Sequence, residues 1–329
     1  MEYRFLGTTG VKVSSLCLGT LTFGREADRS ESEAIYKCCR DAGVNFFDTS
    51  NIYNKGESER ILGDLIANSR DEVFITSKVG GKPGGGVDEN GGSSRRNIMT
   101  LVEGSLKRLK TDRIDLYLIH AFDENTPLEE ALRALDDLVK QGKVLYIGAS
   151  NFAAWQVMKG LGISSKNGLS AFQCIQQIYN LLKRQAEVEI LPLALSEKIG
   201  VVTFNALAGG LLTGKYAKKD RQEKSRFDEV PLYHIRYGED WMYESAERFA
   251  EFALSLGFSP ASLSVAWVSN HPAITAPVVG ARNVTQIKEI LEFTKIKMSP
   301  ELYSRIASFS PTPPPATDLP ERVKSLDVH

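Results

Sequence analysis

The amino-acid sequence predicts an α/β protein built as a single (β/α)8 barrel, the TIM-barrel fold, over residues 1–329. From about residue 15 onward, short runs rich in β-forming residues alternate strictly with longer segments of helical period, and there are eight of each. Strict alternation favours a parallel sheet, and eight repeats favour its closure into a barrel. The alternative, an open doubly wound sheet, usually carries a G-x-G-x-x-G turn after an early strand, and this sequence has no such turn.

Start signals support several of the expected helices. Ser30 or Ser32 can cap the first, Glu57 and Glu59 put acid at the start of the second, and Pro127 opens the fourth. The expected strands lie at 15–18, 45–48, 73–78, 114–120, 144–149, 172–176, 201–204 and 276–280. The expected helices lie near 30–42, 57–69, 95–109, 128–141, 152–161, 186–198, 242–256 and 283–293.

Some segments fall outside this alternation. An N-terminal stretch alternates around a Thr-Thr-Gly turn, which predicts a β-hairpin that closes the bottom of the barrel. The glycine-rich stretch 80–94 predicts a mobile loop, residues 217–240 form an insertion, and the proline-rich tail 311–329 is expected to be extended. The parts predicted within one domain are therefore a hairpin at 2–14, the barrel at 15–295 and a C-terminal extension at 296–329.

The composition narrows the class of protein. Hydrophobic residues make up 42% and charged residues 25% of the chain, and the net charge of −1 argues against nucleic acid or an anionic membrane as partner. No apolar run approaches the ~20 residues that span a bilayer, and the N-terminus lacks a signal-peptide core. The four cysteines show no metal-ligand spacing. We therefore expect a cytoplasmic protein with reduced thiols and no metal site.

Three apolar runs in the first third of the chain end on ionisable residues: Asp48, Lys78 and His120. Tyr53 follows Asp48 by five residues. In a parallel barrel these strand ends meet at one face, where the active sites of such barrels lie. Each residue has an ordinary explanation alone, as a capping acid, a surface charge, a core histidine or a half-buried tyrosine. Their joint position at strand ends favours a proton-transfer site.

Longer motifs around these residues resemble the aldo-keto reductase superfamily, in particular its branch that includes potassium-channel β subunits. The catalytic side matches in FFDTSNIYNKGESERILG (46–63), FITSKVG (74–80), DLYLIHAF (115–122) and IGASNF (147–152). The cofactor side matches in QQIYNLLKR (176–184), LAGGLLTGKY (207–216) and PVVGARNVTQIKEIL (277–291). The resemblance runs from the hairpin to about residue 295. It implies that Asp48, Tyr53, Lys78 and His120 form the family's catalytic tetrad.

The chemistry of the tetrad can be stated in physical terms. Reducing a carbonyl by hydride transfer leaves an alkoxide unless a proton arrives, and tyrosine, with an ordinary pKa near 10, is a slow donor. A Lys78 ammonium about 4 Å away would favour the tyrosinate by roughly 4 kcal/mol, or about three pKa units before any cost of burial. Asp48 would keep Lys78 charged, and His120 would donate a hydrogen bond to the substrate oxygen.

The resemblance also implies how the cofactor is held. Ser150, Asn151 and Gln176 would bind the nicotinamide carboxamide and Tyr179 would stack on its ring, although Ser150 could equally cap a helix and Tyr179 could be a core residue. The sequence departs from the family at Ile290, where Asn is frequent. The full set of cofactor positions is Gly19, Thr20, Asp48, Ser150, Asn151, Gln176, Tyr179, Asn205, Leu207, Gly209, Lys215, Gly280, Arg282, Gln286 and Glu289.

Two phosphate-binding signals can be examined separately. The segment 277–291 reads as a strand, a glycine and a helix start, which favours an anionic phosphate, and Arg282 suits an adenosine 2′-phosphate. We therefore expect NADP(H) as the cofactor. The segment GGLLTGKY (209–216) resembles a P-loop, but Tyr216 stands where the magnesium-binding Ser or Thr should be, so an ATPase is rejected.

Three functions are compatible with these patterns. The first is an NADP(H)-dependent carbonyl reductase or alcohol dehydrogenase that acts on a small aldehyde, ketone or alcohol. The second is a Schiff-base aldolase that uses Lys78, although Asp48 and Tyr53 beside it fit a reductase better. The third, implied by channel-subunit members of the family, is an NADP(H)-binding regulatory or sensor subunit with little turnover.

Overall fold

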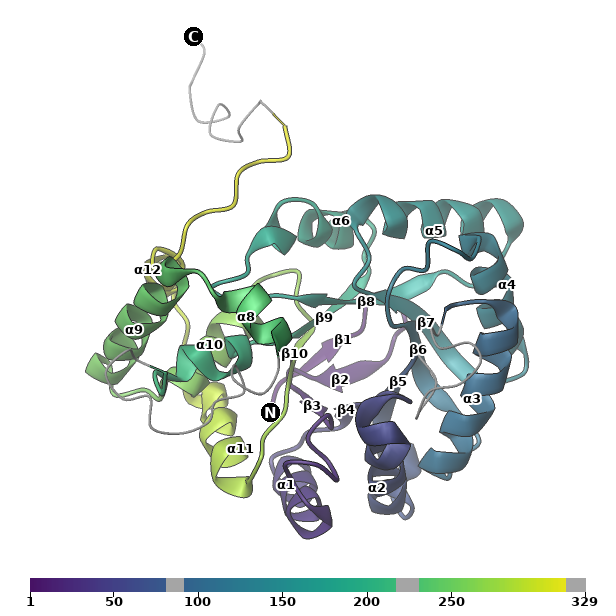
Figure 1. Cartoon of the computed structure of the whole chain (residues 1–329), viewed down its shortest axis with the longest axis horizontal. Coiled ribbons are helices and arrows are strands. Elements are labelled where there is room, and N and C mark those ends of the chain that lie inside the picture. Colours follow the sequence, from purple (N-terminus) through teal and green to yellow (C-terminus); the bar gives the residue numbers. More distant parts are fainter. Residues whose placement is uncertain (81–91, 217–230, 318–329) are drawn as a thin grey trace.

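The computed structural model describes residues 1–80, 92–216 and 231–317. Parallel strands pair in a closed ring in the order β10-β3-β4-β5-β6-β7-β8-β9, with helices around them (Figure 1). This closed eight-strand ring confirms the predicted (β/α)8 barrel. The strands are β3 Cys17–Gly19, β4 Phe46–Asp48, β5 Phe74–Val79, β6 Ile114–Ile119, β7 Val144–Ser150, β8 Phe172–Ile178, β9 Gly200–Phe204 and β10 Ala276–Val279. Each lies within two residues of its expected position.

Helices follow the strands in the expected order. The first helix is capped by Asp28, whose side chain accepts from the amide of Glu31, so the prediction of a serine cap is wrong. The fifth runs past residue 161 to Asn167, where Gly168 ends it at φ 62°. The helices that match the expected ones are α1 Arg29–Asp41, α2 Glu57–Ile66, α3 Arg95–Leu109, α4 Leu128–Lys140, α5 Ala154–Asn167, α6 Ile190–Ser196, α9 Asp240–Ser255 and α11 Val284–Leu291.

Three further helices were not expected: α8 Pro231–Tyr237, α10 Pro260–Ser269 and α12 Pro300–Ala307. All ten residues of α10 are buried, so its sequence has no polar face and therefore no helical period to detect. Ser299 caps α12, whose Tyr303 stacks on the α10 residue Trp267 with ring centroids 5.3 Å apart. The C-terminal extension therefore begins with a packed helix, followed by residues 311–315 without regular secondary structure.

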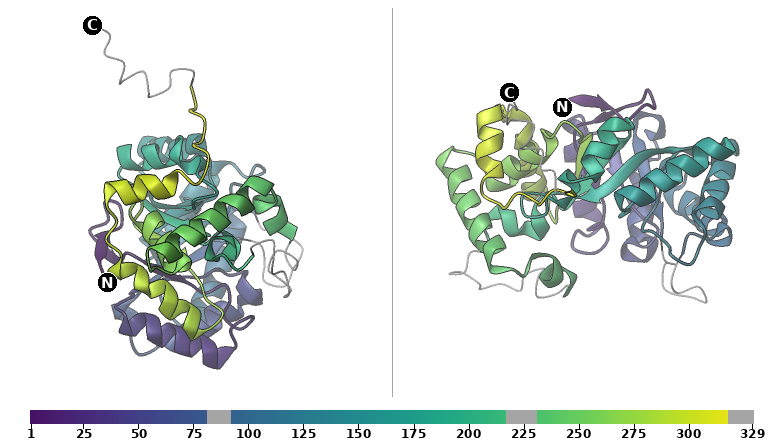
Figure 2. Two further views of the ribbon diagram at one scale, coloured as in Figure 1. Left: turned by 90° about the vertical axis from the view of Figure 1, so that its left-hand side faces the viewer. Right: turned by 90° about the horizontal axis from the view of Figure 1, so that it is seen from above.

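The N-terminal hairpin closes the lower end of the barrel, as expected. Its strands β1 Tyr3–Phe5 and β2 Lys12–Ser14 pair antiparallel at one end of the barrel (Figure 2). Leu6 and Val13 join the inner barrel core. Gly7 lies at φ +56°, and a Cβ there would come within 2.8 Å of backbone atoms at the starts of β8 and β9. Because the hairpin covers this end, an active site is expected at the opposite end of the barrel.

Several expectations concern residues outside the described ranges. Most of the glycine-rich stretch 80–94, residues 217–230 of the insertion and residues 318–329 of the tail belong to this group. The prediction of one domain over the whole chain stays a prediction. Within the described ranges no single helix is long and apolar enough to cross a membrane, although α9 and α10, bent by 100° at their junction, together meet the length and composition test.

Candidate active site

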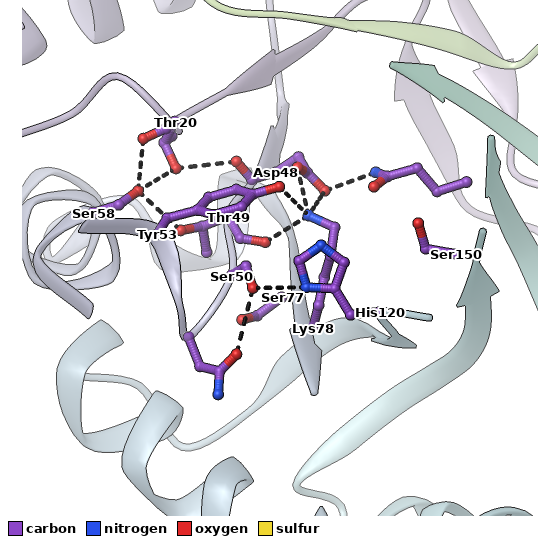
Figure 3. A network of polar contacts seen from close by, with 12 residues as sticks. Thr20, Asp48, Thr49, Ser50, Tyr53, Ser58, Ser77, Lys78, His120 and Ser150 are labelled. Carbon is purple, nitrogen blue, oxygen red and sulfur yellow. Dashed lines mark hydrogen bonds and ion pairs between the residues drawn. The ribbon is translucent and has the colours of Figure 1, made fainter. Parts of the chain in front are cut away.

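The barrel register brings the carboxyl ends of the strands side by side. Asp48 ends β4, Lys78 is the next-to-last residue of β5 and His120 directly follows β6. Asp48 pairs in register with Gly19 of β3 and with Thr76 of β5. The structure therefore gathers the side chains of Asp48, Tyr53, Lys78 and His120 at one end of the barrel (Figure 3).

Lys78 is the centre of this group and is fully buried. Its Nζ donates to Asp48 Oδ1 at 2.7 Å and Oδ2 at 2.8 Å, to the carbonyl of Thr49 at 2.8 Å and to Tyr53 Oη at 3.2 Å. Burial alone would lower the pKa of Lys78, but Asp48 and the Tyr53 hydroxyl raise it above its ordinary value. Lys78 therefore stays an ammonium, which disfavours its use as a Schiff-base nucleophile.

Tyr53 reaches Lys78 because of an unusual turn. It begins the 3-10 segment η1 Tyr53–Gly56, in which Asn54 and Lys55 take positive φ values of 46° and 54°. Burial around the hydroxyl raises the pKa of Tyr53 above 10, and the nearby Lys78 charge offsets this only in part. The Lys78 charge thus lowers the Tyr53 pKa, as expected, but the cost of burial is larger and makes the net shift upward. The hydroxyl holds its proton at neutral pH.

His120 is a neutral side chain at the cavity. Burial first, and then the Lys78 charge, lower the pKa of its imidazole to about 3. Its ring meets the Tyr53 ring edge-on, with centroids 6.1 Å apart. The backbone of His120 is held by Val79, whose carbonyl accepts from its amide at 3.0 Å, and by Asn151, whose Nδ2 donates to its carbonyl at 3.0 Å.

A buried hydroxyl network supports β4 from behind. Thr20 is fully buried, its Oγ1 donates to the Asp48 carbonyl at 3.0 Å, and Ser58 Oγ lies 2.7 Å from it. Ser58 also lies 3.1 Å from Thr49 Oγ1 (Figure 3). Thr20 does not line the cavity, so its predicted place among the cofactor contacts is corrected to a supporting one. Ser58 could not be identified from the sequence, because isolated serines at helix starts are common.

A cavity of about 410 Å³ opens above these groups. Asp48, Tyr53 and His120 line it, whereas Lys78 lies beneath them. The expected cofactor positions that also line it are Gly19, Ser150, Asn151, Gln176, Asn205, Leu207, Gly209, Lys215, Gly280, Arg282, Gln286 and Glu289. The same cavity is thus lined by the acid–base groups at the strand ends and by most of the positions expected to hold a dinucleotide.

Tyr179 is not among the residues that line this cavity. It is fully buried, its hydroxyl donates to Glu187 at 2.6 Å, and its ring stacks on Trp267 with centroids 5.4 Å apart. The expected stacking of Tyr179 on a nicotinamide ring is therefore wrong. Phe204, the last residue of β9, lines the cavity, and its position at a strand end was a signal that the sequence offered. The Arg236 guanidinium lies 5.8 Å from the Phe204 ring centroid.

The insertion contributes residues that sequence reasoning missed. Helix α8 brings Tyr233 and Arg236 to the cavity, where they join Lys215 and Arg282. The segment that resembles a P-loop forms the 3-10 segment η4 Ala208–Thr213 after β9 and lines this same cavity.

The cavity fits an anionic dinucleotide. Three basic side chains line it, from Lys215, Arg236 and Arg282, and the described part of the chain offers the Arg282 guanidinium no hydrogen bond or ion pair. Asn205 Nδ2 is buried without a hydrogen-bond partner among the described residues. An unpaired buried donor is costly unless a ligand accepts from it. Gly209, at φ +69°, would place a Cβ 2.5 Å from the Tyr233 ring, so only glycine lets η4 approach this closely.

Several backbone amides at the start of α11 already have hydrogen-bond partners, so fewer of them can donate to a ligand than expected. Glu31 Oε1 accepts from the Val284 amide at 2.6 Å, and Asn283 Oδ1 accepts from the Gln286 amide at 3.0 Å. Gln286 in turn accepts from the Arg282 amide at 2.9 Å. The amides of Arg282, Val284 and Gln286 are therefore already paired within the chain.

No group of three or more His, Cys, Asp or Glu side chains could hold a metal ion among the residues that the structure describes. The four cysteines are free, and burial raises the pKa of the Cys17, Cys39 and Cys174 thiols.

Comparison with known proteins agrees with this geometry. The model of the aldo/keto reductase family matches residues 15–311. The chain is 37% identical over 325 residues to "Uncharacterized oxidoreductase YrpG" of Bacillus subtilis, covering 95% of this chain and 97% of that protein. It is 33% identical over 327 residues to "Probable voltage-gated potassium channel subunit beta" of Oryza sativa subsp. japonica, covering 97% and 99%. It is 30% identical over 331 residues to "Versiconal hemiacetal acetate reductase" of Aspergillus parasiticus, covering 92% and 94%. The chain belongs to the aldo/keto reductase family.

Proposed function

We propose that this protein is an NADP(H)-dependent oxidoreductase that interconverts a small aldehyde or ketone and the corresponding alcohol. Membership of the aldo/keto reductase family and its oxidoreductase relatives give the general class. The observation that carries the proposal is a buried series of hydrogen bonds from Asp48 through Lys78 to Tyr53. Tyr53 and His120 line the same cavity.

Each of the four side chains has a distinct part in the proposed reaction. A bound nicotinamide cofactor supplies the hydride in reduction. Tyr53 gives its hydroxyl proton to the substrate oxygen as negative charge develops there, and takes the proton back in alcohol oxidation. Lys78, 3.2 Å from that hydroxyl, stabilises the tyrosinate that remains. His120 orients the substrate oxygen by a hydrogen bond.

Asp48 has to hold Lys78 charged and in place. Both of its carboxylate oxygens accept from Nζ, and Oδ2 also accepts from Gln176 Nε2 at 2.9 Å. Removing a charged partner from such a buried pair typically leaves an uncompensated charge that costs several kcal/mol. The high pKa of Tyr53 then has a use, because the donor stays protonated across the physiological pH range and ionises only when the reaction demands it.

The choice of NADP(H) over NAD(H) is supported by Arg282. Its guanidinium lines the cavity beside α11 and lacks a hydrogen-bond partner in the described ranges. A planar guanidinium binds a phosphate through two parallel hydrogen bonds. Lys215 and Arg236 would offer further positive charge to the pyrophosphate, and Ser150, Asn151 and Gln176 would hold the nicotinamide end.

The proposal is tested by fluorescence titration of the purified protein with NADPH and NADH, followed by a panel of aldehydes and ketones in which NADPH oxidation is recorded. We expect tighter binding of NADPH and turnover of part of the panel. Tighter binding of NADH would overturn the role of Arg282. Absence of binding for both cofactors would overturn the class of reaction.

A second candidate is a cofactor-binding regulatory subunit with little turnover. The similarity to the rice protein named as a channel β subunit, over nearly the full length of both chains, supports it. The same titration separates the candidates, since stoichiometric NADPH binding with negligible oxidation across the whole panel would favour the regulatory function. A cytoplasmic location stays a prediction.

A further inference from the structure

The neutral imidazole of His120 can offer the cavity either a hydrogen or a lone pair. A neutral imidazole carries one N–H donor and one acceptor nitrogen, and the partner of one nitrogen decides the role of the other. Nδ1 of His120 lies 3.3 Å from Ser50 Oγ. Nε2 has no hydrogen bond within the described part of the chain, and His120 lines the same cavity as Tyr53.

Ser50 has a single hydrogen and two neighbours that could accept it. Its side chain is fully buried, with Oγ 3.3 Å from His120 Nδ1 and 3.4 Å from Asn51 Oδ1 (Figure 3). A carbonyl oxygen only accepts, so the Asn51 contact would need that same hydrogen. Hydrogen bonds ordinarily span about 2.5–3.0 Å between two oxygens and about 2.7–3.2 Å between a nitrogen and an oxygen. Both contacts of Ser50 are long, but the His120 contact lies close to its upper limit and the Asn51 contact lies well beyond its own, so Asn51 is the weaker competitor.

We propose that Ser50 is a positioning residue that donates to Nδ1 and so holds His120 in the tautomer with its hydrogen on Nε2. This inference rests on the proposed carbonyl reduction, in which Nε2–H donates to the substrate oxygen beside Tyr53. Val79 and Asn151 fix the backbone of His120 on both sides. The hydroxyl of Ser50 is therefore the group left to fix the protonation of the ring.

The tautomer can be read directly from the ligand-free protein by long-range ¹H–¹⁵N NMR with ¹⁵N-labelled histidine at neutral pH. The chain has four histidines, and His120→Gln assigns the signals of His120. His271 is an internal reference, because its Nδ1 accepts from the Ala273 amide at 3.2 Å and its hydrogen must therefore sit on Nε2. We expect His120 to show the same pattern as His271. A hydrogen on Nδ1 of His120 in the wild type would overturn the proposal.

A pair of variants sharpens the test. Ser50→Ala removes the donor, so the population with Nε2–H should fall and kcat for reduction should fall by the same factor, with the Kd for NADPH unchanged. Ser164→Ala is the matched control, since Ser164 is also buried but its Oγ donates to the Ser170 carbonyl, away from the cavity. An unchanged His120 tautomer in Ser50→Ala would overturn the proposal.

The NMR and kinetic results separate this inference from the proposed function. The tautomer is measured without substrate, so it stands or falls independently of any turnover. If Ser50→Ala changes the tautomer but leaves kcat unchanged, Ser50 keeps its role on His120 and the part of His120 in the reaction is overturned.

Discussion

The two sides of the cavity differ in how fully their polar groups are paired. On the side of β4 to β6, Lys78 is bonded to Asp48, Thr49 and Tyr53, and the groups are locked together without any ligand. On the side of β9 to α11, two groups have no hydrogen-bond or ion-pair partner among the described residues: the buried Asn205 Nδ2 and the Arg282 guanidinium. The side of β4 to β6 is thus preorganised, whereas on the side of β9 to α11 a cofactor, in the function proposed above, would supply the missing partners.

Removing the cation from the paired side should have the largest effect. Lys78→Met keeps the length of the side chain but leaves the buried Asp48 carboxylate without its ammonium partner. We expect the free energy of unfolding to fall by about 3–5 kcal/mol in urea denaturation, together with loss of turnover. The double variant Asp48→Asn, Lys78→Met removes both charges and should recover much of the stability but none of the activity. Equal stability of Lys78→Met and the wild type would show that this side is not charge-locked.

The half-buried, neutral His120 should make the paired side sensitive to acid. Its pKa is about 3 in the folded protein and about 6.5 in an unfolded chain, so between these values the unfolded state binds a proton that the folded state does not. The free energy of unfolding therefore falls as pH falls from 6.5 toward 3, with an upper limit of about 2–3 kcal/mol lost by pH 4.5. The actual loss should be smaller, because the ring is partly exposed to solvent. His120→Gln should show a flatter pH dependence in thermal unfolding, and parallel curves for the two proteins would refute the shifted pKa.

The unpaired side should respond in ligand binding more than in stability. Arg282→Met should weaken NADPH binding by about 1.5–3 kcal/mol, more than tenfold in Kd, while leaving NADH binding and unfolding nearly unchanged. Arg236→Met is the matched comparison, and it should weaken both cofactors by one common factor because both carry the pyrophosphate. An equal loss for NADPH and NADH in Arg282→Met would assign Arg282 to a group that the two cofactors share.

The smallest expected effect separates Phe204 from Tyr179. Phe204→Leu removes an aromatic face from the cavity and should weaken both cofactors by about 0.5–1.5 kcal/mol in the same titration. Tyr179→Phe removes only a hydroxyl that is bonded to Glu187, and it should leave the cofactor Kd unchanged. The reverse pattern would restore the stacking role that the sequence suggested for Tyr179.

The paired side was largely predictable because its signal lies within single segments. An apolar run that ends in Asp48 or Lys78 marks a strand end, and the fold rule then brings those ends together. The sign of the Tyr53 pKa shift was not predictable, because the cost of burial depends on packing that no single segment contains. Helix α10 was not predicted for a related reason, since a helix buried on all sides lacks an amphipathic pattern.

The unpaired side was harder to predict because it combines distant segments. The acceptor on the Val284 amide comes from Glu31, more than 250 residues away, so the sequence around Arg282 could not show that the helix start is occupied. Arg236 reaches the cavity from an insertion whose fold had no sequence signal. Tyr179 and Phe204 both lie near strand ends, and only the position of the strand β9 decides which ring faces the cavity.

The most direct measurement compares the wild type with Tyr53→Phe in carbonyl reduction and in NADPH titration. The variant keeps the ring and loses only the hydroxyl that Lys78 contacts at 3.2 Å. We predict that kcat/KM falls by roughly 10²–10⁴ while the Kd for NADPH stays the same. Reduction at the wild-type rate by Tyr53→Phe would contradict the assignment of the proton donor.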